Sequence, residues 1–276
     1  MIIIKIGLIQ LKPSKDKKDN IIKAEKMIRE AALNGAEIIS LPEIFNTHYS
    51  SEYFASNAET YPFGKTIKML SIAAALNKIY LIGGSVPEKY EDKLYNTCFI
   101  FDRCGKLIAR HRKLHLFDID IKGKISFKES LYFSPGSSIT VFDTDCCRVG
   151  VCICFDIRFP EIFRIMADLG AKLIFVPAAF NMTTGPKHWE TLFKSRAMDY
   201  QVYTAGISPA RDELSSYTAY GNSIICSPFG EVLSSLDEKE GILYGDIDME
   251  YLEKVRLELP LTKSRRLDLK VEKIKG

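Results

Sequence analysis

The sequence has no long apolar run, little net charge and no even set of cysteines, and each absence argues against a class of protein. No apolar stretch approaches the roughly 18–20 residues that cross a bilayer, so we expect no membrane partner. The 38 Lys and Arg residues nearly balance the 35 Asp and Glu residues, which leaves a net charge of +3 and predicts no nucleic-acid partner.

Cysteine usage argues against a secreted protein. Seven cysteines are an odd number in a chain with no secretory signal, so a disulfide framework is not expected. The apolar N-terminal segment, residues 1–9, is short, lacks a cleavage site and is expected to form a first strand. Together these features indicate a reducing compartment, and we expect a cytoplasmic protein.

Apolar residues recur at helical spacing in some segments and form short continuous runs in others, so strands and helices are expected to alternate. Helices are expected over residues 20–34, 66–77, 160–169 and 189–200. Strands are expected over residues 2–10, 36–41, 79–86, 172–177 and 202–207, with further strands inside 140–154. Two segments, 96–109 and 222–233, share the pattern of a hairpin with a glycine in its turn, which suggests two similar halves.

This alternation predicts an α/β fold in which each half forms a mixed sheet with helices on its outer face. The two sheets would pack face to face, and loops from distant segments would meet at the rim formed by the strand ends. Because no low-complexity linker separates the halves, residues 1–276 are expected to form one domain. The basic tail, about 261–276, is expected to be a surface arm or a dimer contact. Gly83-Gly84 lacks the glycine pattern of a phosphate site and is expected to be a close packing point.

Cys154 is the leading candidate for a catalytic nucleophile. Residues 150–161 predict an apolar strand that ends in a polar turn and then opens a helix, and Cys154 lies at this junction. A thiol in the middle of a strand is only a small hydrophobe, whereas a thiol that faces a helix N-terminus can ionise and meet a substrate. A buried strand thiol remains the alternative interpretation.

Glu43 and Lys113 also follow apolar strands, and with Cys154 they can form a covalent hydrolase. In such an enzyme the thiolate attacks a carbonyl carbon, the carboxylate accepts the thiol proton and returns it to the leaving amine, and the ammonium stabilises the oxyanion. The backbone N–H of Phe155 is a candidate second oxyanion donor, and Glu129 could orient Lys113 or position the hydrolytic water. Each charged residue taken alone is more often a solvated loop charge.

Four motifs that are spread along the chain contain these residues. They are Leu41-Pro42-Glu43, Arg112-Lys113-Leu-His-Leu-Phe-Asp, Phe127-Lys-Glu129-Ser, and Gly150-Val-Cys-Ile-Cys154-Phe-Asp-Ile-Arg-Phe-Pro-Glu161. In this order they resemble the nitrilase, or carbon-nitrogen hydrolase, superfamily over nearly the whole chain. The resemblance implies a catalytic triad of Glu43, Lys113 and Cys154, with Glu129 as a second glutamate. It also implies a four-layer α-β-β-α sandwich and no cofactor.

Three further segments, 180–190, 195–203 and 208–212, resemble the omega-amidase branch of that superfamily. The resemblance implies that the substrate is a monoamide of a dicarboxylic acid, such as 2-oxoglutaramate or 2-oxosuccinamate, cut to the 2-oxo dicarboxylate and ammonia. It also implies a homodimer that forms through helices, or a higher homo-oligomer. Hydrolysis of N-carbamoyl amides is the alternative chemistry.

Such a substrate carries a carboxylate far from its amide, so the pocket should offer a cation and hydroxyl donors opposite Cys154. Arg158, four residues after the nucleophile, is the candidate cation. A salt bridge from Arg158 to Asp156 or Glu161 would explain this arginine equally well.

The resemblance adds Tyr49, Phe180 and Thr184 to the substrate pocket. The chain departs from the omega-amidase branch at two positions, because His48 stands where proline is common and Phe155 stands where tyrosine is common. Neither change removes a catalytic group. His48 could alter the stiffness of its loop and so the shape of the acyl pocket.

Three rival interpretations make different demands on the sequence. His111 and His115 with Cys152 and Cys154 are zinc-ligand types, but Cys-x-Cys on a strand leaves little room for tetrahedral ligation, so no metal site is expected. A Cys-His dyad using His111, His115 or His188 leaves the glutamate and the lysine at the strand ends unexplained. A protein that only binds a ligand or a partner on the same fold needs no nucleophile.

Overall fold

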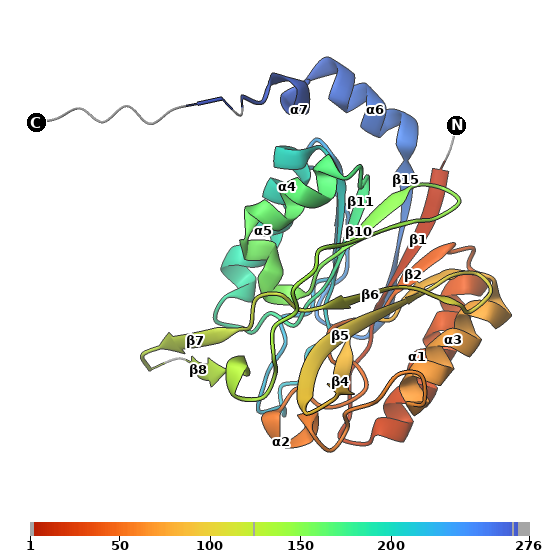
Figure 1. Ribbon diagram of the computed structural model, residues 1–276, viewed down its shortest axis with the longest axis vertical. Helices are drawn as coiled ribbons and strands as arrows, with labels where there is room; N and C mark the ends of the chain where they lie inside the picture. The colour runs from red at the N-terminus through yellow and green to blue at the C-terminus, as the bar shows by residue number, and fades with distance from the viewer. Residues whose placement is uncertain (1–2, 124, 267, 270–276) are drawn as a thin grey trace, which may run out of the picture.

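The computed structural model describes residues 3–123, 125–266 and 268–269 and contains two large mixed sheets (Figure 1). The strands of the first sheet are β1 Ile3–Gln10, β2 Ile38–Ser40, β3 Tyr80–Ile82, β4 Val86–Tyr90, β5 Lys93–Phe101, β6 Leu107–Arg112 and β15 Gly241–Asp248. This 7-stranded sheet has the order β15-β1-β2-β3-β5-β4, with β6 paired to β5.

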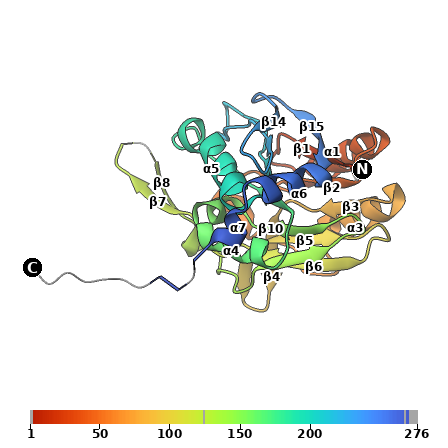
Figure 2. The same ribbon diagram turned by 90° about the horizontal axis from the view of Figure 1, so that it is seen from above.

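The second sheet is built from the C-terminal half. Its strands are β9 Thr140–Asp143, β10 Arg148–Val151, β11 Leu173–Pro177, β12 Tyr203–Ile207, β13 Ile224–Cys226 and β14 Val232–Ser235. They form a 6-stranded sheet in the order β14-β13-β12-β11-β10-β9. A separate hairpin of β7 Asp118–Ile121 and β8 Ile125–Lys128 projects from the body (Figures 1 and 2).

The two sheets repeat one pattern of strand pairing, which confirms the expected similarity of the halves. In the first sheet β1, β2 and β3 run parallel, and β15 and β5 flank them antiparallel. In the second sheet β10, β11 and β12 run parallel, and β9 and β13 flank them antiparallel. Each half therefore brings the carboxyl ends of parallel strands to one edge, where α/β proteins place their sites.

Helices cover the outer faces of both sheets. The longer helices are α1 Lys17–Leu33, α3 Lys65–Asn77, α4 Pro160–Asp168, α5 Gly185–Tyr200 and α6 Met249–Glu258. The short ones are α2 Ser51–Phe54, α7 Leu261–Ser264 and the 3-10 turns η1 Glu129–Leu131 and η2 Cys154–Arg158. Helices α1 and α3 lie on the first sheet, and α4 and α5 lie on the second (Figure 1). None of the described helices is both long and apolar enough to span a membrane.

The core lies between the sheets. Ile6 and Leu8 of β1 belong to one buried cluster with Val149 and Val151 of β10, whereas Ile9 packs in the cluster with the helices on the other face. This split follows from the alternation of side chains along a strand. The α-β-β-α sandwich implied by the resemblance is therefore confirmed, and from the shared core we infer a single domain.

Two helices begin earlier than their apolar spacing predicts. Helix α1 begins earlier than expected, at Lys17, because the Asp16 side chain accepts hydrogen bonds from backbone N–H groups of the first turn. Helix α5 also begins earlier than expected, at Gly185, because Pro186 in its first turn has no N–H to lose.

One expected strand is wrong. The strand expected over residues 79–86 is divided, since β3 ends at Ile82 and β4 begins at Val86. The helix expected from Pro160 is confirmed, because α4 begins at Pro160 and η2 forms the turn between Cys154 and that helix. Of the basic tail, residues 261–266 and 268–269 are described, so half of the expected surface arm lies outside the described residues.

The close packing expected at Gly83-Gly84 is confirmed. A Cβ atom on Gly84 would lie 2.2 Å from the Pro42 carbonyl oxygen, and Gly84 has a φ of 58°. Beside it, the Ser85 N–H donates to the same Pro42 oxygen at 3.1 Å. The glycine therefore holds the backbone that leads directly into Glu43.

We predict that Gly84→Ala lowers the free energy of unfolding by about 2–4 kcal/mol, because the new methyl group meets backbone atoms that cannot move aside. Gly123→Ala is the matched control, since Gly123 has a similar φ of 72° but no atom within 4 Å of its Cβ position. Gly123→Ala should lower the free energy of unfolding by only about 1–2 kcal/mol, which is the cost of a positive φ for alanine. Urea unfolding measures both values, and equal losses would contradict the steric explanation.

Candidate active site

Cys154 lies three residues beyond the end of β10, at the start of η2. Its φ of 48° is a left-handed conformation that non-glycine residues seldom adopt, and such strain is concentrated at functional sites. The residue is 5% exposed and lines a small cavity, so its sulfur is buried but not sealed away. We refer to this space as the Cys154 cavity.

Glu43 follows β2 and faces the Cys154 thiol. The thiol is hydrogen-bonded to the Glu43 carboxylate. The same carboxylate accepts hydrogen bonds from Lys113 Nζ at 2.8 Å, from Asn96 Nδ2 at 2.9 Å and from the Ala179 N–H at 2.9 Å. Glu43 is 1% exposed, so all of its interactions are with the protein.

Lys113 follows β6 and lies between two carboxylates. Its Nζ is 2.8 Å from Glu43 Oε1 and 2.8 Å from Glu129 Oε2, and its side chain is fully buried. Burial alone would lower the pKa of Lys113, but attraction from Glu129 and Glu43 outweighs this effect and raises the pKa well above its ordinary value. Lys113 is therefore a fixed ammonium.

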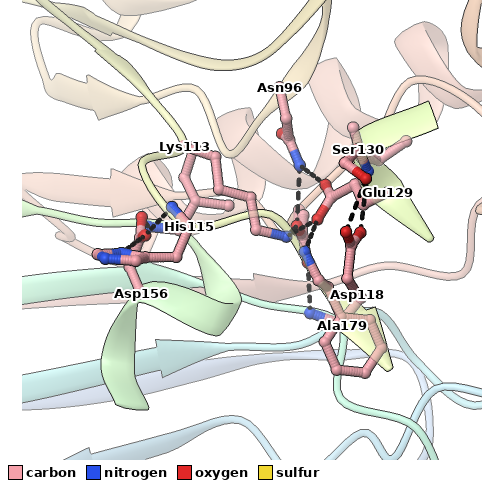
Figure 3. Close-up of polar contacts among 12 residues, drawn as sticks. Asn96, Lys113, His115, Asp118, Glu129, Ser130, Asp156 and Ala179 are labelled. Carbon is pink, nitrogen blue, oxygen red and sulfur yellow. Dashed lines mark hydrogen bonds and ion pairs between the residues drawn. The ribbon is translucent and has the colours of Figure 1, made fainter. Parts of the chain in front are cut away.

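Glu129, at the start of η1, holds Lys113 from the other side. Its Oε2 atom also accepts the Phe117 N–H at 2.6 Å, and its Oε1 atom accepts Asn96 Nδ2 at 3.2 Å. Lys113 and Asn96 both point toward this carboxylate (Figure 3). Burial raises the pKa of Glu129, and Lys113 opposes that shift. The structure thus brings together all the predicted catalytic side chains.

The resting form of Cys154 is the thiol. Burial raises its pKa well above the ordinary value, the negative charge of Glu43 raises it further, and Lys113 acts in the opposite direction. A neighbouring base must take the proton during attack, and the hydrogen-bonded Glu43 carboxylate is in position to do so.

Arg158, Phe180 and Thr184 line the Cys154 cavity. The Arg158 guanidinium lies 5.0 Å above the Phe180 ring, and its Nη1 is 3.1 Å from His188 Nδ1. Within the described residues it makes no ion pair, which removes the salt-bridge explanation for this arginine. Phe155 also lines the cavity through its side chain, and the oxyanion role of its N–H stays a prediction.

The structure separates Tyr49 from the other substrate-binding candidates. Tyr49 lines a second small cavity, which is lined by Glu43 but not by Cys154, and we refer to it as the Glu43 cavity. Tyr217 lies between the two, since it lines both and its ring centroid is 4.4 Å from that of Tyr49. The Tyr217 hydroxyl donates to the Ala179 carbonyl.

His111 and His115 contact a buried aspartate rather than the nucleophile. Asp156 Oδ2 is 3.4 Å from His111 Nε2, and Asp156 Oδ1 is 3.0 Å from His115 Nδ1 and accepts the His115 N–H at 2.8 Å (Figure 3). His188 contacts Arg158. In the part of the chain that the structure describes, no three His, Cys, Asp or Glu side chains are grouped as metal ligands.

Sequence reasoning missed Asn96, Ala179, Tyr217 and Asp156. Ala179 acts through its backbone N–H, and Asn96 and Tyr217 reach the site from distant segments, so no local pattern identified them. Asp156 did carry a signal, because it is an acidic residue within an apolar run. It accepts the Ile153 N–H at 3.0 Å and thereby fixes the turn that presents Cys154.

Comparison with known proteins gives consistent results. The family model described as carbon-nitrogen hydrolase matches residues 5–257. The chain is 51% identical over 265 residues to the omega-amidase NIT2-A of Xenopus laevis and to the omega-amidase NIT2 of Homo sapiens, covering 96% of each chain. It superposes on Saccharomyces cerevisiae Nit3, a member of branch 10 of the nitrilase superfamily, with a TM-score of 0.89 and 41% identity, covering 96% of this chain and 97% of that one.

Asp156→Asn should destabilise the protein in a pH-dependent way. Burial would raise the pKa of Asp156, but hydrogen bonds from His111 and His115 outweigh it and leave the folded pKa below its usual range. Its contribution is therefore complete above the unfolded pKa of about 3.9 and is lost as pH falls through the folded value. We expect a loss of about 2–4 kcal/mol near neutrality that shrinks below about pH 4.

Urea unfolding at a series of pH values measures this difference. Asp118→Asn is the control, because Asp118 is exposed and binds only Ser130 through its carboxylate oxygens. The control should cost under about 1 kcal/mol. If Asp156→Asn lowers the free energy of unfolding equally at neutral and acid pH, the shape of the Asp156 side chain rather than its charge is responsible for the stabilisation.

Proposed function

Because this chain belongs to the carbon-nitrogen hydrolase, or nitrilase, family, we propose that it is an omega-amidase that cuts the terminal amide of small dicarboxylic acid monoamides. 2-Oxoglutaramate and 2-oxosuccinamate are the proposed substrates, and the products are the 2-oxo dicarboxylate and ammonia. The observation that carries this proposal is one cavity that holds both Cys154, hydrogen-bonded to Glu43, and Arg158 without an ion-pair partner.

In the first half reaction the Cys154 sulfur attacks the amide carbon while Glu43 takes the thiol proton. Lys113 directs two of its three protons at Glu43 and Glu129, which leaves one for the developing oxyanion. The Phe155 N–H is the proposed second donor. The carbon–nitrogen bond then breaks, Glu43 gives its proton to the nitrogen, and ammonia leaves a thioester on Cys154.

The second half reaction uses the same groups in reverse. A water molecule attacks the thioester carbon and gives a proton to Glu43, and Lys113 again stabilises the oxyanion. The carbon–sulfur bond breaks, and the proton returns from Glu43 to the Cys154 sulfur. Glu129 does not enter either step, and its proposed role is to hold Lys113 charged and in place.

We propose that the Cys154 cavity selects substrates by the group that lies at the opposite end from the amide. Arg158 supplies the positive charge, and Thr184 and Phe180 complete the wall beside it. A carboxylate that reaches Arg158 gains a charge-assisted hydrogen bond in a half-buried setting. We propose that this contact favours monoamides of dicarboxylic acids over uncharged amides.

We also propose that the enzyme works in the cytoplasm as a homodimer. All seven cysteines are free, which suits a reducing compartment. Leucines stand exposed along the C-terminal helices, and Leu257 is 76% exposed beside a surface groove that also includes Tyr200. A second copy that packs helices against this groove would cover them.

Arg158→Met should raise KM for a dicarboxylic monoamide about 10- to 100-fold, because removing a charge-assisted hydrogen bond costs about 1.5–3 kcal/mol. An uncharged amide of equal length should change less than about threefold, since it never used that contact. Arg164→Met is the control, because Arg164 is exposed on α4 and pairs with Asp168. Ammonia release measures all rates, and equal losses for both amides would reject the carboxylate pocket.

A further inference from the structure

Glu43 lies between the Cys154 thiol and a second cavity. On one side its carboxylate meets the thiol that lines the Cys154 cavity. On the other side it forms part of the wall of the Glu43 cavity, together with His48, Tyr49, Ala210, Asp212 and Ser215. The mechanism above uses the first space for the acyl group and leaves the second without a role.

Tyr217 divides the two spaces. It lines both cavities and is buried. Burial raises the pKa of its hydroxyl, and the negative charge of Glu43 raises it further. Its hydroxyl donates to the Ala179 carbonyl, and Ser215 Oγ accepts the Tyr217 N–H at 3.1 Å. The partition is thus fixed at both ends, and an acyl group in the Cys154 cavity does not fill the Glu43 cavity.

The Glu43 cavity adjoins an outer hollow. His48 and Asp212 line both the cavity and the hollow, which also includes Lys15 and Glu52. His48 Nε2 lies 3.0 Å from Ser215 Oγ. This contact lies where the Glu43 cavity adjoins the outer hollow. Small molecules could pass from the surface to Glu43 without crossing the Cys154 cavity.

The two cavities differ in their cations. Within the described residues, no Lys or Arg lines the Glu43 cavity, whereas Arg158 lines the Cys154 cavity. The carboxylates of the Glu43 cavity already have cationic partners, since Lys113 Nζ is 2.8 Å from Glu43 Oε1 and Lys12 Nζ is 3.0 Å from Asp212 Oδ1. A substrate carboxylate therefore finds no free cation in the Glu43 cavity, while water and ammonia need none.

We propose that the Glu43 cavity is the route by which ammonia leaves and hydrolytic water arrives, separate from the cavity that binds the acyl group. The inference rests on the proposed function, because it requires a thioester whose acyl group occupies the Cys154 cavity. Glu43 hands a proton to the leaving nitrogen and later takes one from water, so both small molecules must stand beside its carboxylate. After ammonia leaves, the vacated place beside Glu43 admits the water.

Ala210→Leu tests the route, because Ala210 lines the Glu43 cavity, is 3% exposed and takes no part in the proposed chemistry. The larger side chain fills space that water needs. We expect the thioester on Cys154 to form within about threefold of the unsubstituted rate and to be hydrolysed at least about tenfold more slowly, so that it accumulates. Rapid quenching with 2-oxoglutaramate and intact-mass measurement follow both steps.

A second variant and a control keep the test decisive. His48→Trp narrows the mouth from a half-buried position and should also accumulate thioester if Ala210→Leu does not fold. Ala55→Leu makes the same chemical change at an exposed residue that lines neither cavity and should turn over normally.

Two results would overturn the route. Slower thioester formation with a raised KM would show that the Glu43 cavity holds substrate, and unchanged kinetics in both cavity variants would show that water and ammonia pass elsewhere. These failures differ from failure of the proposed function itself. In that case the unsubstituted protein would release no ammonia from any monoamide.

Discussion

Burying the Lys113 ammonium is tolerated only because two carboxylates lie 2.8 Å from it. Those carboxylates are in turn held by the Asn96 amide and by the backbone N–H groups of Phe117 and Ala179. The donors come from β5 and from loops of both halves, so the cluster forms only when the two sheets are packed. The same cluster keeps Cys154 protonated at rest, because the nearby negative charge and burial together outweigh the ammonium.

This arrangement gives Glu43 different surroundings on its two sides. Toward Cys154 it faces a space with a cation at its far end, which suits the carboxylate of a monoamide. Away from Cys154 it faces a space that no Lys or Arg of the described residues lines, which suits water and ammonia. In the proposed mechanism one side chain serves both half reactions. A separate path for small molecules would let it do so while the acyl group stays in place.

The sequence predicted the architecture and the charged centre because both leave local patterns. Runs of apolar residues marked the strands, and Glu43, Lys113 and Cys154 stood where those runs ended. The strained φ of Cys154 and its short 3-10 turn had no such pattern, since they depend on hydrogen bonds to Asp156. Tyr49 and Tyr217 occupy a partition made by loops from different halves, which spacing along the chain does not reveal.

The rate of ammonia release from a dicarboxylic monoamide by Glu43→Gln, compared with His115→Ala, tests the central claim that a carboxylate activates the thiol. The account predicts a fall in kcat of about 10²–10⁴ for Glu43→Gln, since the amide cannot take the thiol proton. It predicts a change of less than about tenfold for His115→Ala, because His115 contacts Asp156 rather than Cys154. A loss at His115 as deep as the loss at Glu43 would contradict it and favour a Cys-His dyad.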